Sequence, residues 1–256
     1  MTLPAQRPVE LQTTSLERGS EASMAPTKRA IGAQRYAIMR SVDSFPSSAA
    51  RWLAVAVLIG VVTLLASFAI NPGPPPGSSL QQMTTFGFVH AADILLGGWM
   101  QMTGTALAIV FALGLVWLTQ STARLDGLLT LLGCAVLLAV SLAELAGYAL
   151  VTSGDLSVVR VGAPLIAAVQ RGYSVLAAPL VFAPLGALLL RSGLLGRPLA
   201  YGALVLAALF WLLGLANSLI PLQALIDILS AFQGLWWLWA GLALLRRASL
   251  RSPPLP

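Results

Sequence analysis

Charge is scarce in this sequence. Of its 256 residues only 9% are Asp, Glu, Lys or Arg, whereas 57% are hydrophobic. An average soluble domain is roughly one quarter charged, so the composition argues against a water-soluble globular protein. The net charge of +6 would ordinarily suggest nucleic-acid binding. Because the basic residues flank long apolar runs, we interpret them as a topological signal and expect no nucleic-acid partner.

Three residue types that build many reactive sites occur once each. Cys134 alone excludes a disulfide within this chain, a cysteine-based zinc site and an iron–sulfur cluster held by its thiolates. His90 alone excludes haem held by two histidines of the chain and the HExxH zinc motif. Lys28 lies outside every apolar run, which excludes a Schiff base inside the membrane. The GxSxG and GxxxxGK[ST] motifs are also missing, so we assign no catalytic residue, cofactor or metal.

Long runs of apolar residues make up most of the sequence. A helix needs about twenty apolar residues to span the hydrocarbon core of a bilayer. Helices are expected because backbone groups in lipid must be hydrogen-bonded internally, and a barrel would show short alternating strands. The sequence therefore predicts an all-α, polytopic membrane helix bundle within residues 51–247, in contact with the lipid bilayer. Its six transmembrane helices are expected near residues 52–71, 94–118, 127–151, 163–190, 198–220 and 223–245.

The segments outside this bundle are polar. Residues 1–50 are mixed in charge and lack a sustained amphipathic period, which predicts a disordered cytoplasmic tail. Met1, Met24 and Met39 remain alternative starts. Residues 248–256 are predicted to form a cytoplasmic C-terminal tail.

Proline marks the breaks in the apolar pattern. The sequence NPGPPPGSS at residues 71–79 is unsuited to a helix or a central strand, and it should begin a long extramembrane loop that ends near His90. Pro179 and Pro184 predict a bend in the fourth span. Pro221 marks the turn between the last two spans, which should form an antiparallel hairpin.

The distribution of Lys and Arg predicts the orientation. Thirteen of the fifteen basic residues lie on one side of the predicted bundle: those of the N-terminal segment up to Arg51, then Arg124, Arg191 and Arg197, and those from Arg246 onwards. The other side has only Arg160, and Arg171 lies within the fourth span. Short cytoplasmic loops are enriched in Lys and Arg, so both termini are predicted to be cytoplasmic.

Two opposite charges are expected at the same depth in the membrane. Glu144 precedes the outer end of the third span by about seven residues, and Arg171 follows the outer start of the fourth by about eight. At a rise of 1.5 Å per residue, both should lie roughly 10 to 12 Å below the outer surface. Because isolated charges are costly there, we expect Glu144 and Arg171 to pair across the two helices. The pair could be purely structural or part of a working site.

Other polar side chains also gather in the outer half. Ser141, Glu144 and Tyr148 recur along one face of the third span. This one-sided distribution predicts a polar hollow that opens outward, while the cytoplasmic half stays apolar. The candidate intramembrane polar site consists of Asp93, Gln101, Glu144, Arg171, Asn217 and Asp227.

Several of these residues also have plainer interpretations. His90 and Asp93 could be solvated at the membrane surface, and Asp227 lies about one turn inside its span. Cys134 is best explained as a packing residue. Glycines in membrane helices more often form close helix contacts than ligand sites, and this interpretation is preferred for Gly97, Gly214, Gly234 and Gly241.

The C-terminal third carries a resemblance to a known group. The stretch PLVFAPLGALLLRSGLLGRPLAYGALVLAALFWLLGLA and the ending WLWAGLALLRR are similar to a family of uncharacterised bacterial six-helix integral membrane proteins, a domain of unknown function. The family's R-S-G turn is matched by residues 190–193, whereas Gly196 stands where a proline is common. The resemblance implies a multi-pass protein of the inner (plasma) membrane and supplies no catalytic residues.

Three functional classes follow from these features. The first is a protein that binds or transports a small solute or lipid through the outward polar hollow. The second is an accessory or scaffold protein with a membrane-protein partner, in which Glu144 and Arg171 form a structural pair. The third is an intramembrane enzyme that uses Glu144, Asp227 or His90.

Overall fold

The computed structural model describes residues 47–250, except positions 72, 76, 122–123 and 221. No strand occurs in this part of the chain, so the all-α prediction is confirmed. Residues 47–50 and 248–250 were predicted as tail, but they form the ends of helices. The rest of both predicted tails lies outside the described residues. The helices are α2 (Ser47–Ile70), α3 (Leu80–Val89), α4 (Ala91–Leu118), α5 (Leu125–Val151), α6 (Leu156–Gly172), the π-helical segment η1 (Tyr173–Ala177), α7 (Ala178–Ser192), α8 (Arg197–Ala216) and α9 (Gln223–Leu250).

Six of these helical stretches are long and apolar enough to cross a membrane, as expected for a multi-pass membrane protein. Five are α2, α4, α5, α8 and α9, and the sixth is the continuous helix formed by α6, η1 and α7 over Leu156–Ser192. Their number agrees with the prediction. The largest difference is in the fourth span, which begins at residue 156 instead of 163 and has 37 residues.

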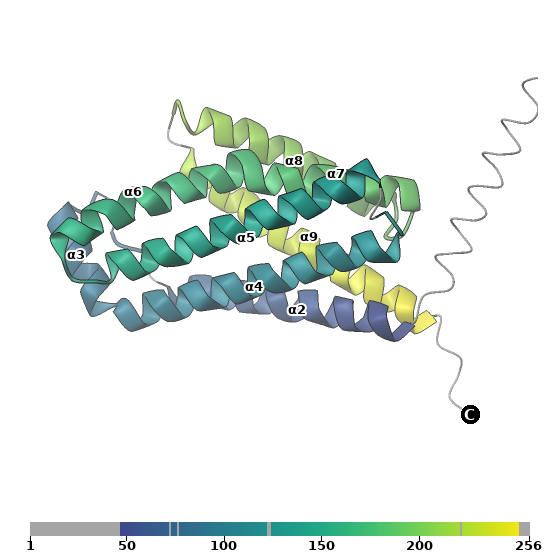
Figure 1. Ribbon diagram of the computed structural model, residues 1–256, viewed down its shortest axis with the longest axis horizontal. Helices are drawn as coiled ribbons and strands as arrows, with labels where there is room; N and C mark the ends of the chain where they lie inside the picture. The colour runs from purple at the N-terminus through teal and green to yellow at the C-terminus, as the bar shows by residue number, and fades with distance from the viewer. Residues whose placement is uncertain (1–46, 72, 76, 122–123, 221, 251–256) are drawn as a thin grey trace, which may run out of the picture. The chain divides into compact units, whose positions relative to one another are not determined.

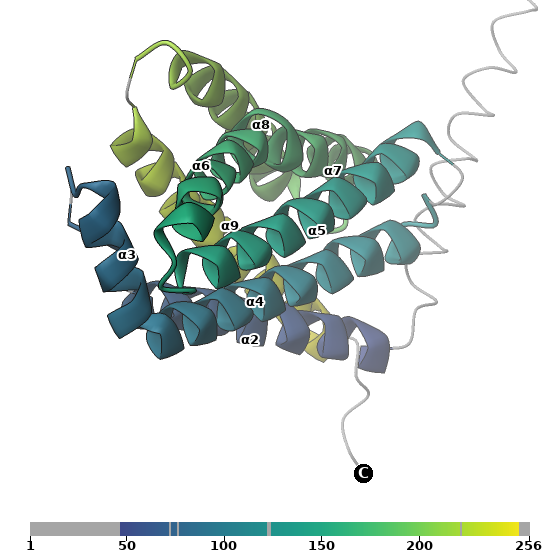
Figure 2. The same cartoon turned by 60° about the vertical axis from the view of Figure 1, so that its left-hand side comes forward.

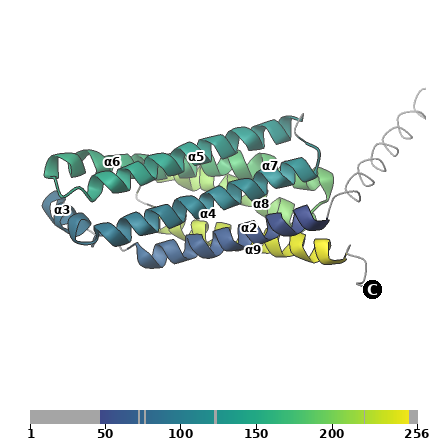
Figure 3. The ribbon, with the colours of Figure 1, turned by 60° about the horizontal axis from the view of Figure 1, so that its bottom comes forward.

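The spans pack around a common axis in the order of the sequence. Helix α2 contacts α4, α4 contacts α5, and α5 contacts both halves of the fourth span. Helix α7 then contacts α8, α8 contacts α9, and α9 returns to α2. Figures 1 and 3 show α2 and α4 side by side, and α3 at one end of the bundle. We call this the α3 end; the loop between α7 and α8 lies at the opposite end (Figure 1).

Large side chains fill the half of the bundle that is farther from α3. Phe111 of α4 and Phe182 of α7 meet Trp236 and Trp237 of α9, and all four are buried. The indole Nε1 of Trp236 donates to the backbone oxygen of Leu199 at 2.9 Å. This contact fixes α9 to the first turn of α8 and satisfies the polar atom of a buried aromatic ring.

Helices α2 and α4 approach closely where glycines face each other. A Cβ atom added at Gly104 would lie 2.7 Å from the backbone oxygen of Gly60, well inside van der Waals contact. Small residues allow the backbones of membrane helices to come this near. The crossing of α2 and α4 therefore depends on the absence of a side chain at Gly104.

The predicted loop after residue 71 contains a helix that the prolines concealed. The hydroxyl of Ser79 accepts from the backbone N–H of Gln82 at 3.3 Å, and the Gln82 side chain accepts from the backbone N–H of Ser79 at 2.8 Å. This reciprocal capping box satisfies backbone donors that are otherwise unpaired at a helix start. It begins α3, which packs against α4, α5 and α6 (Figure 2).

The fourth span departs from regular α-helix shortly before Pro179. Pro179 has no N–H, and its ring crowds the carbonyl group four residues earlier, at Val175. That carbonyl lies in the π-helical turn Tyr173–Ala177, which widens the helix there. The bend predicted at Pro179 and Pro184 stays a prediction: the observed irregularity is this π-helical turn before Pro179, and Pro184 lies within α7.

The early start of the fourth span is explained by a cap. The Asp155 carboxylate accepts from the backbone N–H and the hydroxyl of Ser157 at 2.7 and 2.6 Å. These hydrogen bonds stabilise the first turn of α6 and hold the pKa of Asp155 below its ordinary value. Helix α6 consequently begins directly after Asp155.

Candidate functional site

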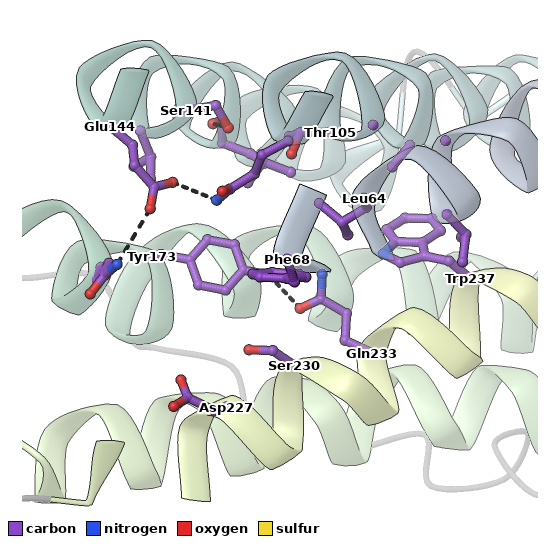
Figure 4. A pocket seen from close by; sticks show the side chains of 18 of the residues that line it. Leu64, Phe68, Thr105, Ser141, Glu144, Tyr173, Asp227, Ser230, Gln233 and Trp237 are labelled. Atoms are coloured by element: carbon purple, nitrogen blue, oxygen red, sulfur yellow. Dashed lines mark hydrogen bonds between the residues drawn. The ribbon is translucent and has the colours of Figure 1, made fainter. Parts of the chain in front are cut away.

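A polar cavity of about 170 Å³ lies inside the bundle, between the aromatic core and the α3 end. Figure 4 shows Glu144 and Ser141 projecting from α5, Thr105 from α4, and Asp227, Ser230 and Gln233 from α9. The ring of Trp237 contributes to its wall at the side of the aromatic core. We call this the polar chamber. Its wall also includes Gln101, Tyr148, Gln170, Tyr173 and Gln223.

Glu144 is the centre of a hydrogen-bond cluster in this chamber. Its carboxylate accepts from Gln101 Nε2 at 2.8 Å and from the Tyr148 hydroxyl at 3.0 Å. Gln170 Nε2 approaches the same carboxylate at 3.5 Å, the limit of a hydrogen bond. Residues 144 and 148 are one turn apart on α5, whereas the two glutamines come from α4 and α6. The cluster therefore ties three helices together through one carboxylate.

A second polar contact crosses the chamber. The hydroxyl of Tyr173, the first residue of η1, donates to the Gln233 side-chain oxygen (Figure 4). The Tyr173 ring also packs edge-on against Phe210 of α8, with 5.7 Å between the ring centroids. The widened turn of the fourth span is thus held against α8 and α9 at the wall of the chamber. Such π-helical segments are frequently found at functional sites.

A larger cavity of about 810 Å³ lies beside the polar chamber, towards the α3 end. We call it the apolar chamber. Phe68, Gln101, Tyr148 and Gln170 line both cavities, so the two share a wall. Most other lining residues are apolar and come from α2, α3, α5, α6 and α9; they include Leu65, Met83, Phe86, Val151, Val159, Ala163, Ile166, Ala231 and Gly234.

Three of the six predicted site residues line these cavities: Gln101, Glu144 and Asp227. Asp227 accepts from Gln223 Nε2 at 2.9 Å, one turn earlier on α9. The other three lie elsewhere.

The predicted pair between Glu144 and Arg171 is wrong. The ion pairs within 4.0 Å among the described residues join His90 to Asp93 and Arg191 to Asp126. Consecutive residues of a helix point about 100° apart, and it is Gln170 that faces Glu144. Arg171 is exposed on the bundle surface. The depth of two residues along their helices does not determine whether their side chains point toward each other.

Asp93 and Asn217 serve helix ends. Asp93 lies exposed in the first turn of α4, 3.8 Å from His90, where a negative charge complements the helix dipole. Asn217 lies in the turn between α8 and α9, and its Oδ1 accepts from the backbone N–H of Leu222 at 2.6 Å. Neither residue lines the two chambers.

Sequence reasoning missed four uncharged polar members of the site, Gln170, Tyr173, Gln223 and Gln233. Gln170 and Tyr173 are three residues apart and share a face. Their charged neighbour Arg171 was predicted as the partner of Glu144 instead. Gln233 lies within the apolar run of the sixth span, close to the tryptophans of α9. A search for amides and hydroxyls at helical spacing would have found the first two.

Gly234 also differs from its expected role. Gly97, Gly214 and Gly241 form close helix contacts, as preferred from the sequence. A Cβ atom at Gly234 would meet nothing within 4 Å, because this residue borders the apolar chamber. Here the missing side chain leaves space within a cavity.

The chemistry that the site offers is hydrogen bonding and negative charge. Among the described residues, no group of three or more His, Cys, Asp or Glu side chains is placed to hold a metal ion. Cys134 is buried and does not line either chamber. No protein-family model, curated protein or solved structure matches the chain. The resemblance of the C-terminal third to six-helix bacterial membrane proteins therefore stays a prediction.

Proposed function

We propose that this protein binds a small solute or lipid in the two neighbouring chambers of its membrane domain. One observation carries the proposal: a polar cavity, with Glu144 in its wall, adjoins an apolar cavity of about 810 Å³ and shares lining residues with it. Ligand sites are typically concavities of about 300 to 1,000 Å³, mostly apolar, with a few convergent polar groups. The larger chamber has that size, and the smaller one supplies the polar groups.

The position of the chambers supports uptake from one side of the membrane. Glu144 precedes the end of α5 at Val151 by seven residues, or about 10 Å of helix. The bundle beyond the polar chamber is filled by buried aromatic and aliphatic side chains such as Phe182 and Leu185. We place the α3 end outside the cell and both termini in the cytoplasm of an inner-membrane protein. A ligand would then enter from outside and rest above the aromatic core.

Thiol labelling tests the cavity directly. In a Cys134→Ala background, single cysteines replace Gln101, Ser141, Ser230 and, as a control, Leu189. The first three line the polar chamber, whereas Leu189 is fully buried towards the opposite end. A membrane-impermeant thiol reagent should label the three chamber positions faster than position 189. Equal rates at all four positions would contradict an accessible hollow.

A filling variant links accessibility to the apolar chamber. Gly234→Trp should occupy open space in that chamber and slow labelling at Gln101. Leu235→Trp is the matched control, because Leu235 is 58% exposed on the outer face of the same helix. If both variants slow labelling equally, the path to Gln101 does not run through the apolar chamber.

The scaffold alternative loses the structural pair on which it was partly based, since Glu144 contacts neutral donors and Arg171 faces outward. A membrane-protein partner and an intramembrane enzyme remain predictions without an observation that favours them. A protein that co-purifies in stoichiometric amount, with thiol labelling of the chamber positions unchanged, would support the scaffold alternative.

A further inference from the structure

We propose that the ligand is a cationic amine with an apolar body, whose ammonium group lies beside Glu144 and whose body fills the apolar chamber. This inference rests on the proposed function and deepens it by naming the ligand class. Three features carry it: the charge of the cavity lining, the donors around Glu144 and the order of the polar and apolar chambers.

The charge of the lining has one sign. Among the described residues that line the two chambers, the charged types are Glu144 and Asp227, and none is Lys, Arg or His. The nearest basic residue in the sequence, Arg171, is exposed on the bundle surface. Charges within a membrane domain usually pair with one another. The described part of the chain provides no cation inside this cavity, and a bound cation would complete the pair.

Among possible ligand groups, a cation would interact most strongly with the Glu144 carboxylate. Its three hydrogen-bond donors, Gln101, Tyr148 and Gln170, are neutral. They orient the carboxylate without neutralising its charge, and an ammonium group would add charge-assisted hydrogen bonds. The faces of aromatic rings also attract cations. Phe68, Tyr173 and Trp237 line the same chamber, so its aromatic wall favours the same ligand charge.

The arrangement of the chambers sets the shape of the ligand. Polar side chains occupy the smaller chamber near the middle of the bundle, and the larger apolar chamber lies nearer the α3 end. The polar end of the ligand therefore lies deeper than its apolar part. A bilayer lipid has the reverse order, with its headgroup at the surface and its chains towards the midplane. A compact amine with one apolar body, entering charge first, fits this order better.

An anionic ligand would meet the opposite conditions. A carboxylate or phosphate beside Glu144 would bring two like charges together in a partly desolvated cavity, where repulsion is strong. A neutral alcohol could replace one hydrogen bond but would gain no charge pairing. The cavity should thus discriminate by charge among ligands that share one apolar body.

Three probes with a common body test this discrimination. Phenylbutylammonium, phenylbutanol and phenylbutyrate carry positive, neutral and negative polar ends on the same apolar frame. Their binding is measured by calorimetry to the full chain in phosphatidylcholine nanodiscs, with empty nanodiscs as the blank for partition into lipid. The amine should bind at least about tenfold more tightly than either other probe, because it alone pairs with the carboxylate.

The variants identify the carboxylate that is used. Glu144→Gln keeps the shape and removes the charge, so it should weaken binding of phenylbutylammonium roughly thirtyfold or more and leave phenylbutanol nearly unchanged. Asp93→Asn is the matched control: it removes an acid outside both chambers and should leave all three affinities unchanged. Loss of discrimination with Asp227→Asn but not with Glu144→Gln would overturn the assignment to Glu144.

The outcomes separate this inference from the proposed function. If phenylbutanol or phenylbutyrate binds as tightly as the amine, and Gly234→Trp abolishes that binding, the cavity is a ligand site but the cation assignment is wrong. If no probe binds above the lipid blank, or if Gly234→Trp leaves every affinity unchanged, the cavity is not the binding site and both proposals fail. Glu144→Gln does not affect the comparison of the three probes on the unaltered protein, so the charge test does not depend on how that variant folds.

Discussion

Gln101 of α4 donates to Glu144 of α5 at 2.8 Å, a contact between two transmembrane helices that places an amide where a countercharge was expected. The partner matters because a neutral donor orients a carboxylate without neutralising it. The same carboxylate accepts from Tyr148 and approaches Gln170. The arrangement holds α4, α5 and α6 together through one carboxylate.

Removal of Gln101 should destabilise the protein by leaving Glu144 with fewer donors. We expect Gln101→Leu to lower the free energy of unfolding by about 1 to 3 kcal/mol, the usual cost of an unsatisfied partly buried group. The double variant Gln101→Leu/Glu144→Leu should recover part of this loss. Unfolding in detergent followed by circular dichroism measures all four members of the cycle. A coupling below about 0.5 kcal/mol would show that the hydrogen bond contributes little.

Arg171 provides the control for that cycle. Because Arg171 is exposed and does not contact the Glu144 carboxylate within 4 Å, the effects of Arg171→Leu and Glu144→Leu should be additive. Strong coupling between positions 144 and 171 would restore the ion pair predicted from the sequence and contradict the observed facing of Gln170.

Two glycines should respond in opposite ways to the same substitution. Gly104→Leu places a side chain against the backbone of α2, 2.7 Å from the oxygen of Gly60, and should destabilise the protein by about 3 kcal/mol or more. Gly234→Leu enters open space and should be neutral or stabilising by up to about 1 kcal/mol, since leucine favours helix over glycine. Thermal unfolding of both variants in the same detergent measures the difference. A large loss with Gly234→Leu would mean that the apolar chamber is not open there.

The sequence predicted the six spans because apolar length is a strong signal and the bilayer allows few alternatives. It failed at α3, where the proline-rich stretch after residue 71 suggested a loop. The capping box of Ser79 and Gln82 was visible in the sequence and would have indicated a helix start. Local hydrogen bonding, not hydropathy, determines this short helix.

The candidate site was predicted only where charge or a repeated polar face marked it. Gln101, Glu144 and Asp227 were found because polar groups inside apolar runs are conspicuous. Gln170 was missed because depth along a helix can be read from residue number, whereas the direction of a side chain depends on how the helix is rotated in the bundle. The π-helical turn at Tyr173 adds to this rotation, and no sequence signal gave its size.

An ion pair joins α5 and α7 at the end opposite α3. Arg191 Nη1 lies 3.4 Å from Asp126 Oδ2, with the arginine side chain 64% exposed and the aspartate side chain 5% exposed. Because Arg191→Leu leaves the buried Asp126 carboxylate without this partner, we expect it to cost about 1 to 3 kcal/mol at low salt, and less at high salt because the arginine is largely solvated. Arg246→Leu, an exposed arginine near the end of α9, is the control. Chemical unfolding at two salt concentrations measures both effects, and a loss independent of salt would indicate packing instead of charge.

The orientation of the bundle can be tested with reporter fusions. The start of α2 and the end of α9 lie at the end opposite α3, as an even number of spans requires (Figure 1). The excess of Lys and Arg at that end predicts that it is cytoplasmic. Gly77 precedes α3, and Asp155 precedes α6. Fusions after these two residues should report outside, and a fusion after Pro253 should report inside. An external signal from Pro253 would reverse the bundle, place the apolar chamber on the cytoplasmic side and require the amine to enter from within the cell.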